Sequence, residues 1–386
     1  NISIEDETKI RFISNQKSEN LKFSYGGNIQ FSNYQNNTQY EFYNTDYNTK
    51  IDFIKYGLFL KSNSTFIDDN LGVSLGVRLD QDNFTQENNI FENISPRLAL
   101  SLIISEDKKW KFNFATGRYF KIPTYTSLGF KNFDNVFLNK SSKYTRSDHV
   151  VGGFEFNWTE SSRFTFEAFY KKYNNYPVSK IDGVSLANKG ADFEVLGNEE
   201  ILTIGKGKSY GLEFLYQQKL KDNFYGILSY TFFYSKFSGL NKIYLPSVWD
   251  NRHLLSFTGG YKLKKNWELS TKIRFTGKTP YSPVDITSST QSYPEIIFDY
   301  SQLGNYYLND FTKLDVRVDK RWNFKSTSMN FYIDIENLLM DEIPVPPEYG
   351  LQRDGNLNIV NPRNLIEVIS DNRSSLIPSI GFVFDF

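Results

Sequence analysis

The sequence predicts an all-β fold, and within that class an antiparallel β-barrel that crosses a membrane. Three observations support this: strand-like segments recur along all 386 residues, short and long connections alternate between them, and the chain ends in an aromatic strand. Aromatic residues, which favour strands, make up 17% of the chain. No uninterrupted apolar run approaches the ~20 residues of a membrane helix, which excludes helical spans but not half-apolar strands.

The strand-like segments alternate apolar and polar residues. Side chains two apart on a strand share a face, so Trp267, Leu269 and Ile273 are expected opposite Ser270 and Arg274. Many segments reach ~10 residues, the length of a tilted membrane strand, whereas soluble strands are nearer ~5–6. About fifteen strands are predicted by these criteria, near 7–14, 19–33, 50–62, 70–82, 95–105, 108–118, 147–158, 162–173, 207–219, 222–236, 252–263, 266–277, 311–323, 326–338 and 375–386.

The connections between these strands differ in length in a regular way. Links such as 105–108 and 159–162 are short. The alternation of such short links with long connections predicts tight periplasmic turns and long extracellular loops. Long connections lie near 119–146, 174–206, 237–251, 278–310 and 339–374.

The predicted number of strands is odd, whereas single-chain bacterial barrels have an even number because both termini lie in the periplasm. The chain also begins at Asn1 without a methionine or a signal peptide, although a barrel must be exported. We therefore expect residues 1–386 to be the C-terminal part of a larger barrel.

The last strand carries an aromatic row. Phe382, Phe384 and Phe386 lie two apart and therefore share one face. Fraying would expose such a row in a soluble protein, whereas in a bilayer it faces lipid and barrel closure holds the strand.

One predicted strand has a strongly charged face. Arg or Lys facing lipid at mid-bilayer costs ~2–4 kcal/mol, so these residues are expected to point into the lumen, toward a plug domain or a water path. Direct substrate contact and the wet face of a soluble protein are the alternatives. The expected lumen- or plug-facing residues are Arg274, Lys313, Asp315, Arg317, Asp319, Arg321 and Glu336.

Tyrosine and tryptophan gather in two settings. Several lie near predicted strand ends, where an aromatic girdle is expected at the lipid headgroups, among them Tyr125, Trp158 and Trp267. Others lie in the loop 278–310, which could form a ligand-recognition surface or a packed loop that closes the mouth. The loop candidates for ligand binding are Tyr281, Tyr293, Tyr300, Tyr306 and Tyr307.

Composition excludes other classes of function. The 44 basic and 44 acidic residues balance, which argues against a nucleic-acid partner, and there is no cysteine for thiolate metal sites. The two histidines, His149 and His253, are far apart in sequence, and no nucleophile–base or zinc motif is present. We expect no enzyme activity, no metal site and no cofactor.

Several short stretches resemble the C-terminal barrel half of a TonB-dependent receptor. They lie in order along nearly the whole chain: Asn93-Ile-Ser-Pro-Arg-Leu-Ala-Leu100, Gly117-Arg-Tyr-Phe-Lys-Ile-Pro-Thr-Tyr125, Arg146-Ser-Asp-His149, Tyr210-Gly-Leu-Glu-Phe214, Trp249-Asp-Asn-Arg-His253, Leu314-Asp-Val-Arg317 and Ile335-Glu-Asn-Leu338. The resemblance implies a 22-stranded barrel with a plug domain and a TonB box. This chain would hold strands eight to twenty-two, without the plug, the TonB box and the first seven strands.

The resemblance implies a receptor in the outer membrane of a Gram-negative bacterium, which imports a siderophore, glycan, peptide or vitamin by TonB-coupled transport. The implied partners are membrane lipid, the plug and N-terminal strands from the same precursor or another chain, TonB through the plug, and a surface lipoprotein. It also implies that the barrel-insertion machinery reads the terminal strand. A docking or secretion barrel without its own substrate is the alternative, and a soluble all-β carbohydrate-binding protein is a third.

Overall fold

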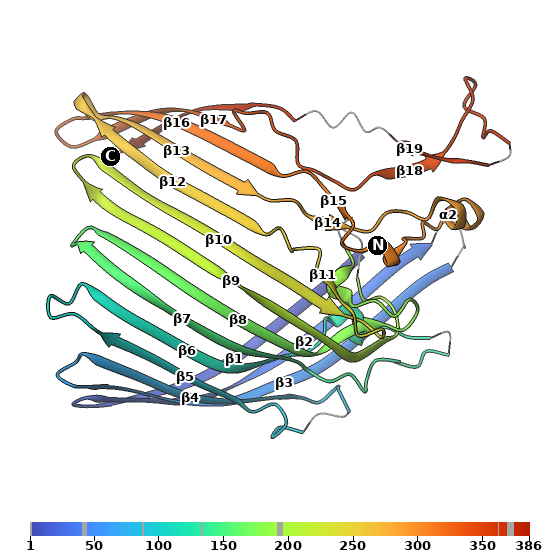
Figure 1. Cartoon of the computed structure of the whole chain (residues 1–386), viewed down its shortest axis with the longest axis horizontal. Helices are drawn as coiled ribbons and strands as arrows, with labels where there is room; N and C mark the ends of the chain where they lie inside the picture. Colours follow the sequence, from blue (N-terminus) through green and yellow to red (C-terminus); the bar gives the residue numbers. More distant parts are fainter. Residues whose placement is uncertain are drawn as a thin grey trace. The chain divides into compact units, whose positions relative to one another are not determined.

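The computed structural model describes residues 2–40, 45–86, 89–132, 134–190, 196–361, 363–368 and 374–386. Its main sheet is antiparallel, and its strands are hydrogen-bonded in sequence order from β1 (Ile2–Ser18) to β20 (Ile377–Asp385) (Figure 1). No helix in the described part of the chain is long and apolar enough to cross a membrane.

All fifteen predicted strands are found in this order. Between β1 and β20 they are β2 (Leu21–Tyr40), β3 (Thr45–Phe66), β4 (Leu71–Asp82), β5 (Ser95–Ile103), β6 (Trp110–Lys121), β7 (Thr145–Thr159), β8 (Ser162–Ser179), β9 (Ile201–Lys221), β10 (Phe224–Ser238), β12 (His253–Leu263), β13 (Trp267–Thr276), β16 (Phe311–Asn323) and β17 (Ser328–Glu336).

Short elements occupy the long connections. The strand β11 (Tyr244–Pro246) pairs with β10, and two small ribbons join β14 (Pro280–Tyr281) to β15 (Tyr306–Tyr307) and β18 (Glu348–Leu351) to β19 (Leu365–Val368). The α-helices are α1 (Tyr125–Leu128) and α2 (Ile286–Ser292), and the 3₁₀ turns are η1 (Leu186–Asn188), η2 (Lys264–Asn266) and η3 (Tyr300–Gln302).

Some strands are longer than predicted at the end with the long connections. The segments expected at 19–33 and 50–62 extend to Tyr40 and from Thr45, and their ladder still pairs Asn37 with Asn48. These extensions are polar on both faces, so they lack the alternation that marks a half-apolar strand. Backbone hydrogen bonds continue there without that sequence signal.

The chain divides into two compact units. Unit 1 comprises Asn1–Gly152, Phe169–Tyr210 and Ser235–Val248, and unit 2 comprises Gly153–Ala168, Gly211–Tyr234 and Trp249–Phe386. Each unit is described separately below.

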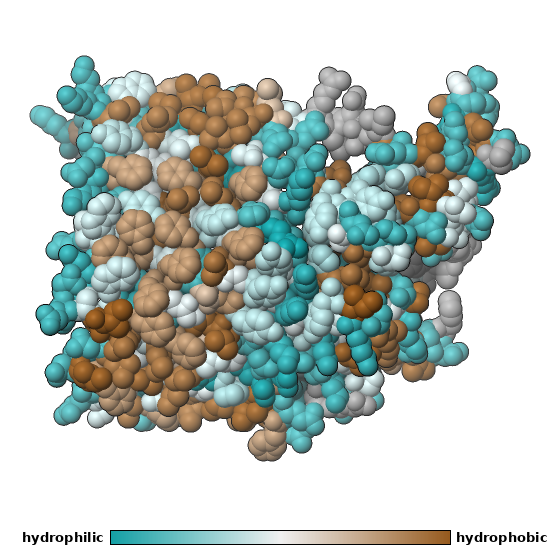
Figure 2. All heavy atoms as spheres, in the orientation of Figure 1, coloured by the Kyte–Doolittle hydropathy of each residue, from teal (hydrophilic) through white to brown (hydrophobic). Residues whose placement is uncertain are grey.

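The strands of each unit have one apolar and one polar face, as the alternation predicts. In unit 2 the register places Leu269, Val318, Ile333 and Ile380 in one row across four strands. These side chains are 45%, 36%, 40% and 68% exposed. Apolar side chains gather over the strands, whereas hydrophilic ones gather over the short turns at the left of the view (Figure 2). The apolar face is therefore an outward surface.

The buried side chains have the opposite character. Among the described residues, 26 buried side chains are polar or charged and 13 are hydrophobic. A soluble β-sandwich would press its apolar rows together in a dry interior, but here those rows are exposed while serine, asparagine and aspartate are buried. The arrangement is that of a membrane protein, and it argues against the soluble carbohydrate-binding alternative.

The terminal strand continues the apolar face. Phe382 and Phe384 lie opposite Phe331 and Met329 of β17, and the rings of Phe331 and Phe382 are 4.9 Å apart. Phe386, two residues beyond Phe384, is 99% exposed.

Candidate functional site

The polar face of β13, β16 and β17 in unit 2 carries a charged network, here called the ionic face. Arg274 lies opposite Lys313 in the register, and Arg317 lies opposite Asp334. Residues on one strand face recur every second position, so the seven residues predicted to face a lumen or plug share this face. They are Arg274, Lys313, Asp315, Arg317, Asp319, Arg321 and Glu336.

Ion pairs link neighbouring strands on the ionic face. The Lys313 ammonium lies 2.8 Å from Glu336 on β17 and 3.6 Å from Asp315 on its own strand. The Arg317 guanidinium donates two hydrogen bonds of 2.8 Å to Asp319 in the bidentate geometry that makes such pairs strong. At the far end Arg321 lies 3.5 Å from Asp385 of β20.

A tyrosine–glycine pair supports the network. Tyr332 lies directly opposite Gly381, and the Arg317 guanidinium lies 3.8 Å from the centre of the Tyr332 ring. A Cβ atom at position 381 would overlap that ring. The glycine therefore lets the ring lie flat across the neighbouring strand and hold Arg317 by a cation–π contact.

We predict that Gly381→Ala destabilises the barrel by about 1–3 kcal/mol, because the new methyl group displaces the Tyr332 ring and its contact with Arg317. Urea unfolding of the full-length protein in lipid vesicles measures this difference. Gly72→Ala is the matched control, since the nearest atom to its Cβ would be 3.8 Å away. Equal midpoints for the two variants would contradict the role given to the glycine.

In unit 1 the connection after β6 folds back onto the polar face of β2 and β3. Its helix α1 places Tyr125 and Leu128 in a buried cluster with Tyr34, Ile51 and Phe53. The Tyr125 hydroxyl also hydrogen-bonds Glu7, and Lys55 contacts both. Tyr125 is only 8% exposed. Its expected place in a headgroup girdle is therefore wrong, because this loop turns inward and buries it.

Asp82, the last residue of β4, joins the end of this connection to the start of the connection that follows β4. Its carboxylate accepts hydrogen bonds from the backbone of Phe84 and Thr85, from the Thr85 hydroxyl and from the Tyr144 hydroxyl, at 2.6–2.7 Å. Burial raises the pKa of Tyr144, and the negative charge of Asp82 raises it further, so Tyr144 stays a neutral donor.

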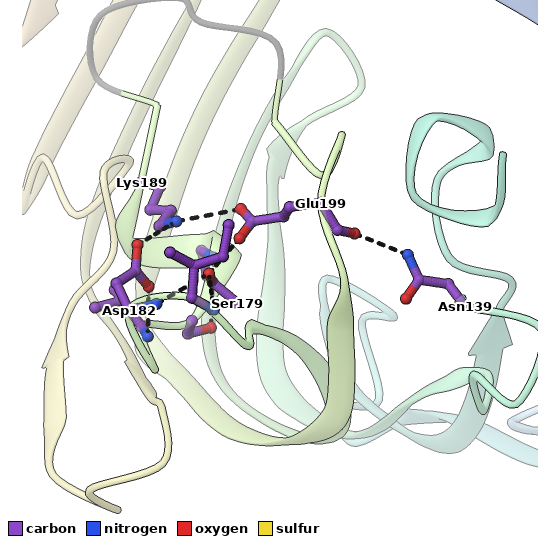
Figure 3. Close-up of polar contacts among 9 residues, drawn as sticks. Asn139, Ser179, Asp182, Lys189 and Glu199 are labelled. Carbon is purple, nitrogen blue, oxygen red and sulfur yellow. Dashed lines mark hydrogen bonds and ion pairs between the residues drawn. The ribbon is translucent and has the colours of Figure 1, made fainter. Parts of the chain in front are cut away.

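A buried lysine organises the long connection between β8 and β9. Figure 3 shows Lys189 between two carboxylates, Asp182 at 2.5 Å and Glu199 at 3.2 Å. The Ser179 hydroxyl donates to the same Glu199 carboxylate. The side chain of Lys189 is 9% exposed and that of Glu199 is 14% exposed. Water therefore screens this ion pair only weakly, and the cluster holds the connection together.

Two asparagines tie this connection to its neighbours within unit 1. Asn139 donates to the carbonyl of Glu199 (Figure 3). It also donates to the carbonyl of Ser127 and accepts from the backbone of Ile201. Asn188 donates to the carbonyls of Leu245 and Pro246 on β11. Three long connections thus form one packed body.

In unit 2 the tyrosine-rich connection also folds on itself. Asp285 caps α2 by accepting from the backbone of Ser288 at 3.0 Å. Tyr281 of β14 pairs with Tyr306 of β15, and their rings meet edge-on 6.0 Å apart. Tyr293 follows α2, and Tyr300 begins η3.

The two last long connections meet. Helix α2 contacts β19. Burial raises the pKa of Tyr281, and the nearby Tyr349, Tyr306 and Glu367 raise it further. The phenol groups of Tyr281, Tyr306 and Tyr349 are here called the phenol cluster, in which the rings of Tyr281 and Tyr306 are in contact. Tyr307 instead lines a separate cavity of about 430 Å³ together with Arg252, Lys278 and Asp310. The five predicted tyrosines are therefore split among several local settings.

The buried charges of unit 1 have no signal in the sequence. Asp182, Lys189 and Glu199 lie in a loop without periodicity, where charged residues are normally solvated. Their contacts depend on how the loop folds. The Tyr332–Gly381 pair could have been suspected, because a glycine inside an alternating strand often marks a close approach.

An exposed apolar sheet face, buried polar side chains and long folded connections are together the features of a membrane-spanning β-barrel protein. The family model for the TonB dependent receptor-like β-barrel matches residues 4–338. The chain belongs to this family, which confirms both the resemblance and the expected barrel fold. Receptors of this family are transporters and not enzymes, as expected.

Solved structures show the same fold at low identity. A ferric enterobactin receptor, PfeA, from Pseudomonas aeruginosa is 15% identical with a TM-score of 0.61, and the match covers 99% of this chain and 53% of that chain. The outer-membrane transporter YddB from Escherichia coli is 11% identical with a TM-score of 0.59, and the match covers 99% of this chain and 53% of that chain. The ferric citrate transporter FecA is 11% identical with a TM-score of 0.60, and the match covers 99% of this chain and 54% of that chain. The chain thus spans about half of each. Comparison with curated protein sequences gave no match.

Proposed function

We propose that this chain is the C-terminal barrel part of a nutrient importer in the outer membrane of a Gram-negative bacterium. The observation that carries the proposal is the partition of each unit into an exposed apolar face and a charged polar face. In this arrangement lipid covers the first, and the ionic face contacts a plug domain or lumenal water. The plug and the first seven strands come from the same precursor or from another chain.

The cargo we propose is a scarce nutrient taken up by TonB-coupled transport. Among siderophores, glycans, peptides and vitamins, ferric chelates are the first class to test, since ferric enterobactin and ferric citrate are named for two similar structures. The phenol cluster around Tyr281 and the cavity beside Tyr307 are the proposed contacts. Phenol rings offer flat, rigid surfaces with hydrogen-bonding hydroxyls.

Uptake of a radiolabelled ferric chelate by cells that express the full-length protein tests this proposal. Uptake should stop when the proton-motive force is uncoupled or TonB is deleted. Accumulation of the chelate that is unchanged by both treatments would instead support the alternative. That alternative is a docking or secretion barrel without its own substrate, with a surface lipoprotein or another chain as partner.

We predict that Phe386→Ser lowers the amount of assembled protein in the outer membrane several-fold. The aromatic row of Phe382, Phe384 and Phe386 is proposed to be read by the insertion machinery, and its last member is fully exposed. Heat-modifiable migration of membrane fractions measures the folded amount. Val383→Ser on the opposite face of β20 serves as the control, since Val383 lies opposite Asn330, and equal loss in both variants would contradict recognition of the row.

A further inference from the structure

A groove on the apolar face of unit 1 has a charged end. It runs across strands from β2 to β8 and has a volume of about 740 Å³. The register aligns Leu60, Val77 and Pro96 along it, and Leu75 and Leu98 beside them. Arg118, Asp148 and Lys172 complete its lining at one end.

The charged end carries an excess of cations. The Asp148 carboxylate bridges two guanidinium groups, with the Nε atom of Arg118 at 2.7 Å and that of Arg146 at 3.2 Å. Both arginines are about one-third exposed, at 38% and 33%. Lys172 is exposed and has no ion pair among the described residues. Three cations against one carboxylate leave a net charge of about +2.

The position of this cluster along the strands fixes its depth. On β6 the same face carries Trp110 near the short-turn end and Arg118, eight residues later, near the long connection. Eight residues span about 26 Å along the strand, or roughly 20 Å in height at a tilt of ~40°. That distance is close to an apolar band of ~25 Å, so an exposed Trp110 marks one boundary and the cations mark the other.

We propose that this groove binds a phosphorylated, multiply acylated glycolipid of the outer leaflet, of the lipid A type. The inference rests on the outer-membrane location in the proposed function. The acyl chains lie along Leu60, Leu75 and Leu98, and the phosphates accept hydrogen bonds from Arg118 and Arg146. Guanidinium groups match phosphate in bidentate geometry, and partial removal from water strengthens the attraction. Lys172 adds a point charge.

Native mass spectrometry of the full-length protein in detergent, titrated with bis-phosphorylated lipid A, tests the proposal. We expect the double substitution Arg118→Gln and Lys172→Gln to weaken binding about tenfold or more, since two charge-assisted contacts are lost. Lipid A stripped of its phosphates should bind the unaltered protein about as weakly as phosphorylated lipid A binds the double variant. Lys320→Gln is the control, because Lys320 lies on the apolar face of unit 2 near Trp267.

A second variant separates binding from structural support. Asp148→Asn removes the one carboxylate at the charged end and should leave lipid A binding equal to or tighter than that of the unaltered protein. Weakening by Asp148→Asn as large as that of the double substitution would overturn the proposal, because the cluster would then serve only to hold strands together. Equal binding of dephosphorylated lipid, or displacement by millimolar inorganic phosphate alone, would also overturn it.

Transport is measured separately. The unaltered protein could fail to take up ferric chelate while lipid A still binds with the expected dependence on phosphate. That result contradicts the importer function and supports the assignment of the groove as a lipid A site. Uptake that is normal while lipid A binding shows no dependence on Arg118 and Lys172 contradicts the groove alone.

Discussion

Lys189→Met is expected to open the packed body that three long connections form in unit 1, here called the loop body. The substitution leaves Asp182 and Glu199 as two carboxylates in a largely buried space without their shared cation. Removing one partner from a buried ion pair costs about 3–5 kcal/mol. The loop can escape this cost by moving into water, so we expect local opening with the strands still folded.

Limited proteolysis of the full-length protein in vesicles measures this opening as a higher cleavage rate within residues 180–200. Lys180→Met is the matched control, because Lys180 pairs with Glu200 at 2.6 Å in the same loop but is 53% exposed. Exposed pairs contribute about 0–1 kcal/mol. Equal cleavage of the two variants would contradict a special role for the buried lysine.

A rescue variant makes the cause specific. Adding Asp182→Asn and Glu199→Gln to Lys189→Met removes the uncompensated charges but keeps the shapes of the side chains. Neutral replacement of a whole buried ionic group is often tolerated, so the triple variant should resist protease better than Lys189→Met alone. A triple variant as sensitive as the single one would point to lost packing of the lysine stem instead.

The strands were predictable because their signal is local and periodic. A membrane strand must be apolar on one side along its whole span, so the alternation of Leu269 and Ile273 with Ser270 and Arg274 reveals both the strand and its facing. The polar extensions of β2 and β3 have no such constraint, and their ends were misplaced. The loop body could not be predicted because its contacts are not local in sequence. The hydrogen bond from Asn139 to Glu199, for example, joins residues 60 apart.

The second large effect concerns the apolar face. Leu75→Arg in unit 1 and Ile273→Arg in unit 2 should each destabilise the folded barrel by about 2–4 kcal/mol, the cost of placing a cation near mid-bilayer. Leu75 is 54% exposed and lies opposite Ser62 and Leu98, on the face that lipid covers in the proposed function. Ser74→Arg and Ser270→Arg are the controls, since Ser74 directly precedes Leu75, Ser270 lies three residues before Ile273, and both are on the polar face. Reversible urea unfolding in vesicles compares the four variants, and equal losses from both faces would mean that hydrocarbon does not cover the apolar side.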